Sequence, residues 1–143
     1  MTATFIGHRE CFGLSKETLQ VTIKQLIEEG VTEFLNGGMG QFDWMRARAV
    51  AELKKSYPQI RNTLVIPYLT FNIQSRELFD DVLYPDGFEK YHFKSAIGKR
   101  NQYMIDNADV AVCYVDHDWG GAVQSYQRAV KKGKRIINLA DKT

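Results

Sequence analysis

Two glycine-rich segments, residues 37–40 (GGMG) and 120–121 (GG), carry the clearest chemical signal in the sequence. Each follows an apolar run and precedes a pattern with helical spacing. A helix N-terminus offers unpaired N–H groups and a partial positive charge, which suits an anion such as phosphate, and glycine allows the backbone to approach closely. A third turn at residues 7–9 (GHR) has the same setting. Tight turns alone would explain one such segment, but three of them predict a ligand site.

The candidate ligand-binding residues lie in these turns or beside them. Arginine suits bidentate phosphate contact, and Trp119, directly before the second glycine pair, could stack on a base. The alternatives are surface arginines, hydrogen-bonded structural histidines and tryptophans that belong to the core. The predicted ligand-binding set is Gly7, His8, Arg9, Gly37, Gly38, Gly40, Asp43, Arg100, Asn101, Asp116, Trp119, Gly120 and Gly121.

Two further kinds of site are not predicted. No GxxxxGKS/T or GxGxxG motif is present, so neither a P-loop nor a dinucleotide fingerprint is indicated. His8 with Cys11, and the run Asp116-His117-Asp118, each form an incomplete set of metal ligands. We therefore predict no metal and no cofactor.

The elements that position these residues alternate along the chain. Short apolar runs predict strands at 3–7, 32–35, 63–69, 109–115 and 135–140. Helical spacing predicts helices after Ser15 and at 41–56, 96–107 and 121–132. Uniformly apolar strands that alternate with helices predict an α/β, Rossmann-like three-layer α/β/α sandwich with a mainly parallel sheet.

In such a sheet, ligands bind at the carboxyl ends of the strands, where the three glycine turns converge. Residues 70–93 show no single period. We expect them to form a long loop with a short helix, and a loop of that length is a candidate lid or site wall.

Length and composition narrow the class of protein. The 143 residues predict one domain, 1–143. No apolar run approaches the roughly 18 residues of a membrane span. Two distant cysteines without a signal peptide predict reduced thiols and a cytoplasmic location. A net charge of +2 does not argue for nucleic acid, which we therefore consider an unlikely partner.

Three segments of the chain resemble the YpsA-like branch of the SLOG superfamily, named for the Smf/DprA DNA-processing proteins and the Lonely Guy enzymes. FIGHRE is similar to the opening F-x-G-H-R of that branch. NGGMGQFDWMRARAV is similar to its G-G-x-G-x-D-x-x-A stretch, with Asp43 as the acidic residue. KRNQYMIDNADVAVCYVDHDWGGAV is similar to its R-N-x-x-M-x-x-x-x-D segment and the glycine turn that follows. The resemblance implies a Rossmann-like fold and a pocket for a nucleotide or a nucleotide-derived ligand.

The Lonely Guy phosphoribohydrolases of this superfamily cleave an N-glycosidic bond and carry R-K-x-x-M and P-G-G-x-G-T-x-x-E motifs. The resemblance places Arg100 where their functional arginine stands and Gln127 where they carry glutamate. Glycosidic cleavage needs a carboxylate to stabilise charge or activate water, and glutamine does neither. Asp43 or Asp116 could substitute, so Asp43 and Arg100 are the candidate catalytic residues.

Three functions follow in order of preference. The first is a binding or sensing module for a nucleotide-like small molecule. The second is a nucleotide hydrolase of the phosphoribohydrolase kind, and the third is single-stranded DNA binding. Basic residues are scattered and closely balanced by acidic ones, which weakens the third. The sequence does not name the ligand, and it leaves open whether the chain forms a homo-oligomer.

Overall fold

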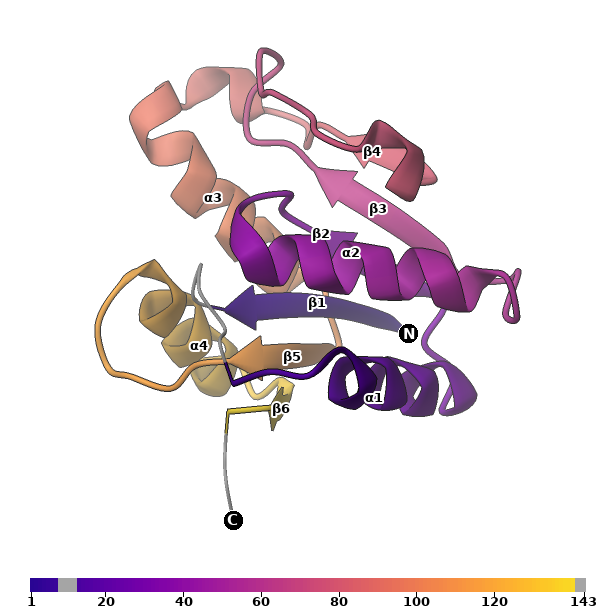
Figure 1. Cartoon of the computed structure of the whole chain (residues 1–143). Helices are drawn as coiled ribbons and strands as arrows, with labels where there is room; N and C mark the ends of the chain where they lie inside the picture. The colour runs from indigo at the N-terminus through magenta and orange to yellow at the C-terminus, as the bar shows by residue number, and fades with distance from the viewer. Residues whose placement is uncertain (8–12, 141–143) are drawn as a thin grey trace.

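The computed structural model, which describes residues 1–7 and 13–140, shows a parallel sheet between two layers of helices (Figure 1). Six strands form the sheet in the order β4-β3-β2-β1-β5-β6, and all the pairings are parallel. The strands are β1 (Thr2–Gly7), β2 (Glu33–Asn36), β3 (Arg61–Val65), β4 (Asp81–Leu83), β5 (Val110–Tyr114) and β6 (Arg135–Asn138). The predicted fold class is confirmed.

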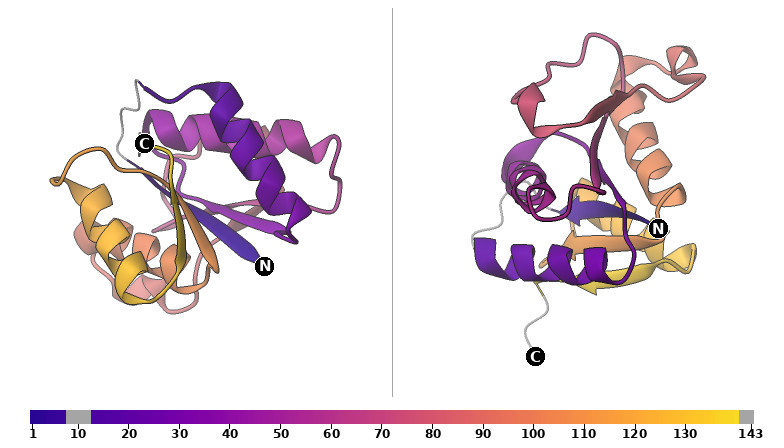
Figure 2. Two further views of the ribbon diagram at one scale, coloured as in Figure 1. Left: turned by 90° about the horizontal axis from the view of Figure 1, so that it is seen from below. Right: turned by 90° about the vertical axis from the view of Figure 1, so that its right-hand side faces the viewer.

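Four α-helices cover the two faces of the sheet. They are α1 (Lys16–Glu28), α2 (Gly40–Lys54), α3 (Phe93–Asp106) and α4 (Gly121–Lys131). Figure 2 shows α1 and α2 on one side of the sheet and α3 and α4 on the other. Side chains of β1 alternate between the layers: Phe5 packs in the cluster with α1 and α2, and Ile6 packs in the cluster with α3 and α4. Burial on both faces explains why the strands read as continuous apolar runs.

The strand order creates a crevice at the carboxyl edge of the sheet. From β1 the chain steps outward to β2, β3 and β4, and it then returns to place β5 and β6 on the other side of β1. β1 and β5 run side by side in register from Ala3 opposite Val110 to Gly7 opposite Tyr114. The direction of strand order reverses between β1 and β5, which is where open α/β sheets bind their ligands.

The first helix begins and ends as its sequence predicts. The hydroxyl of Ser15 accepts a hydrogen bond from the Thr18 backbone N–H at 3.1 Å. Beyond the end of α1, Gly30 adopts a φ of +109°, which residues with a side chain rarely adopt. Leu19, Ile23, Leu26 and Ile27 all face the core, as their spacing indicates.

The region between β3 and α3 is where the sequence-based prediction was wrong. The third strand ends at Val65 and not at residue 69, because Pro67 has no N–H to continue the ladder. Residues 70–93, predicted as a long loop with a short helix, contain two 3-10 turns, Arg76–Leu78 and Phe88–Lys90, and also the edge strand β4, which was not predicted. β4 has only three residues, too few to show a period.

The ends of two other elements also differ from the prediction. α3 starts at Phe93, three residues before the predicted position, because the His92 ring nitrogen accepts from the Lys94 backbone N–H at 3.2 Å and caps the helix. β6 ends at Asn138, whose side-chain oxygen accepts from the backbone N–H groups of Val115 and Ala140 and turns the chain away.

Candidate functional site

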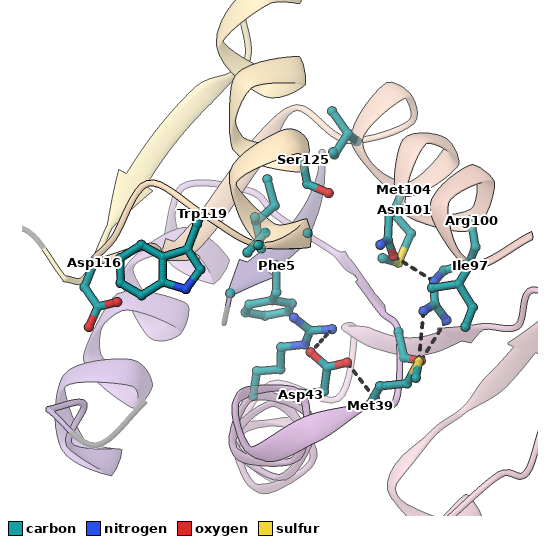
Figure 3. A pocket seen from close by; sticks show the side chains of 18 of the residues that line it. Phe5, Met39, Asp43, Ile97, Arg100, Asn101, Met104, Asp116, Trp119 and Ser125 are labelled. Carbon is teal, nitrogen blue, oxygen red and sulfur yellow. Dashed lines mark hydrogen bonds and ion pairs between the residues drawn. The ribbon is translucent and has the colours of Figure 1, made fainter. Parts of the chain in front are cut away.

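A cleft of about 730 Å³ opens at the carboxyl edge of the sheet, between the ends of β1, β2 and β5 and the helices α2, α3 and α4 (Figure 3). This volume lies within the range of small-molecule sites in proteins, roughly 300–1,000 Å³. The structure brings much of the predicted set into its lining: Gly7, Gly37, Asp43, Arg100, Asn101, Asp116, Trp119, Gly120 and Gly121.

The remaining predicted residues are placed differently. Gly38 does not line the cleft, and its φ of +71° and the position of Leu64, 2.7 Å from where a Cβ would lie, require glycine for the turn itself. Gly40 is the first residue of α2. His8 and Arg9 lie outside the described residues. The cleft lining includes no residue from 70–93.

The N-terminus of α4 faces the cleft with its backbone groups exposed. Gly120 is the N-cap residue, with φ 97° and ψ 173°, and within the described part of the chain no side chain caps this end. The first turn of α4 contains no acidic residue. Among the described residues, no atom lies within 4 Å of where a Cβ on Gly121 would be, so this position has room for a side chain. This end of α4 can accept an anion.

The N-terminus of α2, by contrast, already holds a carboxylate. One oxygen of Asp43 accepts from the Met39 backbone N–H at 2.6 Å, and the other lies 2.6 Å from Nη2 of Arg46. The Asp43 side chain is only 13% exposed. The two glycine-rich turns look alike in sequence but differ in the structure: the N-terminus of α4 is open to the cleft, whereas the N-terminus of α2 is already occupied by the Asp43 carboxylate.

Arg100 forms one wall of the cleft and ties two strand ends together. It is 2% exposed, and its Nη1 donates to the carbonyls of Gly37 at 2.8 Å and Val65 at 3.0 Å. Nε donates to the side-chain oxygen of Asn101 at 2.9 Å. Burial lowers the pKa of Arg100 to about 10, although the charge of Asp43 acts to raise it. Arg100 is therefore positively charged at neutral pH, and only its Nη2 has donor capacity left beyond a long contact with the Met39 sulfur at 3.5 Å.

Arg46 is a site residue that the sequence reasoning missed. It is 2% exposed and lines the cleft. Its guanidinium carbon lies 5.1 Å from the ring centroid of Phe5 and 5.4 Å from that of Phe42, and Nε donates to Asn36 at 3.1 Å. Burial lowers its pKa, and Asp43 acts in the opposite direction. The available signal was an arginine four residues after Phe42, on the apolar stripe of α2.

The rest of the lining is apolar on one side and aromatic at the rim. Ile97 and Met104 of α3 lie beside Arg100 and Asn101, and Ser125 of α4 faces them across the cleft (Figure 3). At the rim, the ring centroids of His117 and Trp119 lie 3.8 Å apart. Nδ1 of His117 lies 2.6 Å from a carboxylate oxygen of Asp116. Trp119 is 67% exposed, so its ring is accessible to a planar group.

Neither a metal-binding cluster nor a membrane-spanning helix is present among the described residues. No group of three or more His, Cys, Asp and Glu side chains is arranged there to hold a metal ion. Within the same residues, no helix has the length and apolar character needed to cross a membrane.

The family model of the YspA SLOG family matches residues 4–138, nearly the whole chain. The chain belongs to this family. A UPF0398 protein of Halalkalibacterium halodurans is 28% identical over 127 residues, covering 82% of this chain and 67% of the relative. A UPF0398 protein of Ligilactobacillus salivarius is 25% identical over 127 residues, covering 82% and 69%. The predicted membership of the YpsA-like branch of the SLOG superfamily is confirmed.

Two solved structures share the fold of this SLOG protein. DNA processing protein A of Helicobacter pylori, which was solved to explain its single-stranded DNA binding mode, has a TM-score of 0.66 and 18% identity over 95% of this chain. DNA processing protein A of Streptococcus pneumoniae has a TM-score of 0.67 and 16% identity over 94%. The chain spans 63% and 48% of these two proteins. At such identities the likeness is one of fold.

Proposed function

We propose that this SLOG protein binds a nucleotide or a nucleotide-derived small molecule in the cleft, as a binding or sensing module. The observation that carries the proposal is the N-terminus of α4, which opens into the cleft and, among the residues that the structure describes, has neither a side-chain cap nor an acidic residue in its first turn. A phosphate group of the ligand binds the backbone N–H groups of this turn.

The remainder of the cleft suits a nucleoside. The exposed ring of Trp119 stands directly before the phosphate-binding turn and offers a stacking surface for a base. The amide nitrogen of Asn101 provides donors, since its side-chain oxygen is already used by Arg100. Ile97 and Met104 supply apolar contact on the same wall.

The test introduces a carboxylate at the phosphate position. Gly121→Asp places a negative charge in the first turn of α4, where acidic residues stabilise a helix, so the fold should be unaffected. Calorimetry with AMP, ADP, GMP and GDP should show binding to the native protein and at least a ten-fold loss in the variant. Gly121→Asn, of the same size without the charge, is the matched control. Equal affinities for the Asp variant and the native protein, or no binding by the native protein, would overturn the proposal.

A nucleotide hydrolase is the alternative that the site supports less well. Both oxygens of Asp43 are already bonded, to Met39 and to Arg46. Gln127 is exposed on α4 and does not line the cleft. We therefore expect little phosphoribohydrolase activity on nucleoside monophosphates. An assay for released base and ribose 5-phosphate tests this directly, and turnover of AMP near 1 s⁻¹ or faster would favour the hydrolase.

Single-stranded DNA is the second candidate ligand. The fold likeness to the Helicobacter pylori protein, together with the exposed Trp119, weakens our expectation that nucleic acid is not a partner. Binding through phosphates falls steeply with salt, whereas a nucleotide enclosed in a cleft responds less. An oligothymidylate titration at two salt concentrations separates the two ligands. Submicromolar binding that is lost at the higher salt would favour DNA.

A further inference from the structure

We infer that the floor of the cleft, formed by Arg46, Arg100 and Asp43, is a second anion subsite, so that the ligand carries two linked anionic groups, as a nucleoside diphosphate does. This inference rests on the proposed function for the first anionic group, which binds at the N-terminus of α4. The floor supplies the contacts for the second.

The first observation is the charge of the floor. Arg46 and Arg100 are both 2% exposed, and Asp43 is the carboxylate beside them. The three groups interact electrostatically, since Asp43 raises the pKa of Arg100 and Arg46 lowers it. The guanidiniums of Arg46 and Arg100 and the carboxylate of Asp43 together carry a net charge of one positive unit, and these side chains are shielded from water. A buried charge without a counterion is unfavourable, and an anionic ligand relieves it.

The second observation is the unused hydrogen-bonding capacity of Arg46. A guanidinium has five N–H donors. Of these, Nε donates to Asn36 and one N–H of Nη2 binds Asp43. Within the described part of the chain the other three N–H groups make no hydrogen bond, although the side chain is almost fully buried and lines the cleft. Charged donors placed in this way are suited to phosphate oxygens.

The third observation is that the floor and the α4 turn lie apart. In Figure 3, Trp119 and Ser125, which flank the α4 turn in sequence, lie on one side of the cleft, and Asp43 and Arg100 lie on the other. Among the described residues of the lining, the other acidic one is Asp116, which lies beyond Trp119 at the rim. Its side chain is half-exposed, so solvent screens its charge. The two anion positions are therefore distinct, and a ligand that occupies both must carry two anionic groups.

The decisive variant is Asp43→Asn. The amide keeps the shape of the carboxylate, and its oxygen can still accept from the Met39 backbone N–H. The substitution removes the negative charge from the floor. We expect it to strengthen binding of ADP and of inorganic pyrophosphate about ten-fold, because two guanidiniums then face the anion without competition. Binding of AMP, which lacks the second group, should change less.

The matched control lies on the same helix. Glu52→Gln changes the net charge of the protein equally, but Glu52 pairs with Lys16 on the surface at 3.2 Å and does not line the cleft. It should leave both affinities unchanged. Arg46→Met should weaken ADP binding at least ten-fold, measured alongside a thermal melt that reports on folding.

The outcomes separate this inference from the proposed function. Equal affinity of the native protein for AMP and ADP, or an Asp43→Asn variant that binds ADP as the native protein does or more weakly, would overturn the second subsite and leave nucleotide binding intact. If no nucleotide binds, pyrophosphate still tests the floor. If the native protein does not bind pyrophosphate at concentrations up to about 10 mM, which is weaker than typical small-ligand affinities, the second subsite is overturned as well.

Discussion

Arg100 joins the carboxyl ends of β2 and β3, and its removal should destabilise the fold. Arg100→Met keeps the length of the side chain and deletes the donors to the carbonyls of Gly37 and Val65, at 2.8 and 3.0 Å. Hydrogen bonds from a charged group contribute about 1.5–3 kcal/mol each, so the gross loss is about 3–6 kcal/mol. Relief of the desolvated charge offsets part of this, and we expect a net loss of about 2–5 kcal/mol in the free energy of unfolding.

The measurement is urea unfolding followed by circular dichroism, with a thermal melt as a second readout. For a chain of this size, each kcal/mol corresponds to about 3–4 °C, so the melting temperature should fall by about 6–20 °C. Arg100→Lys should recover only part of the loss, because an ammonium does not reproduce the planar fork. Lys94→Met, an exposed change on the same helix, should stay within about 0.5 kcal/mol of the native protein.

One result would refute this reasoning about the two strand ends. If Arg100→Met unfolds at the same urea concentration as the native protein, the two carbonyl bonds do not stabilise the fold. If the same variant also loses nucleotide affinity by more than ten-fold, Arg100 acts on the ligand through its remaining N–H groups. A large loss of stability with unchanged affinity would show that its role is structural.

Two further predictions concern packing and pH. Gly7→Ala should lower stability by about 1–3 kcal/mol in urea unfolding, because its Cβ would lie 2.1 Å from Cδ2 of Phe42, whereas Gly98→Ala, with nothing within 4 Å of its Cβ, should raise stability by about 0.5–1 kcal/mol. If Gly7→Ala proved as stable as Gly98→Ala, the close packing of Phe42 against the end of β1 would be contradicted. On the other face, hydrogen bonding from Arg128 holds the pKa of Asp106 below its usual value. A lowered folded-state pKa stabilises the protein above about pH 4, and the stabilisation is lost as the pH falls through that lowered value. Arg128→Met should therefore lower stability by about 0.5–1 kcal/mol at pH 7 and by less near pH 3, measured by unfolding at both pH values; an equal loss at both would show that the ion pair is not responsible.

Much of the architecture was determined by the sequence itself, because local periodicity reports which faces of an element are buried. Uniformly apolar runs between helical patterns led to the parallel sheet, and parallel strands place their carboxyl ends at one edge. The glycine turns after β1, β2 and β5 had to meet there, and the structure puts Gly7, Gly37 and Gly121 in one cleft. Ser15 and Gly30 marked the ends of α1 for local reasons of capping and backbone conformation.

Tertiary structure decided the chemistry of the cleft, because most of the deciding contacts join residues distant in sequence. Arg100 was predicted as a phosphate ligand from its motif, but its partners Gly37 and Val65 lie 63 and 35 residues away. Arg46 stood among ordinary helical charges until packing placed it against Phe5 of another element. The side chain of Asp43 folds back onto the Met39 backbone N–H, four residues earlier, and so places a carboxylate at the first glycine-rich turn. Without that side-chain conformation the turn would present open N–H groups. Spacing in a sequence indicates which residues share a face, and only packing selects the partners that bind and neutralise them.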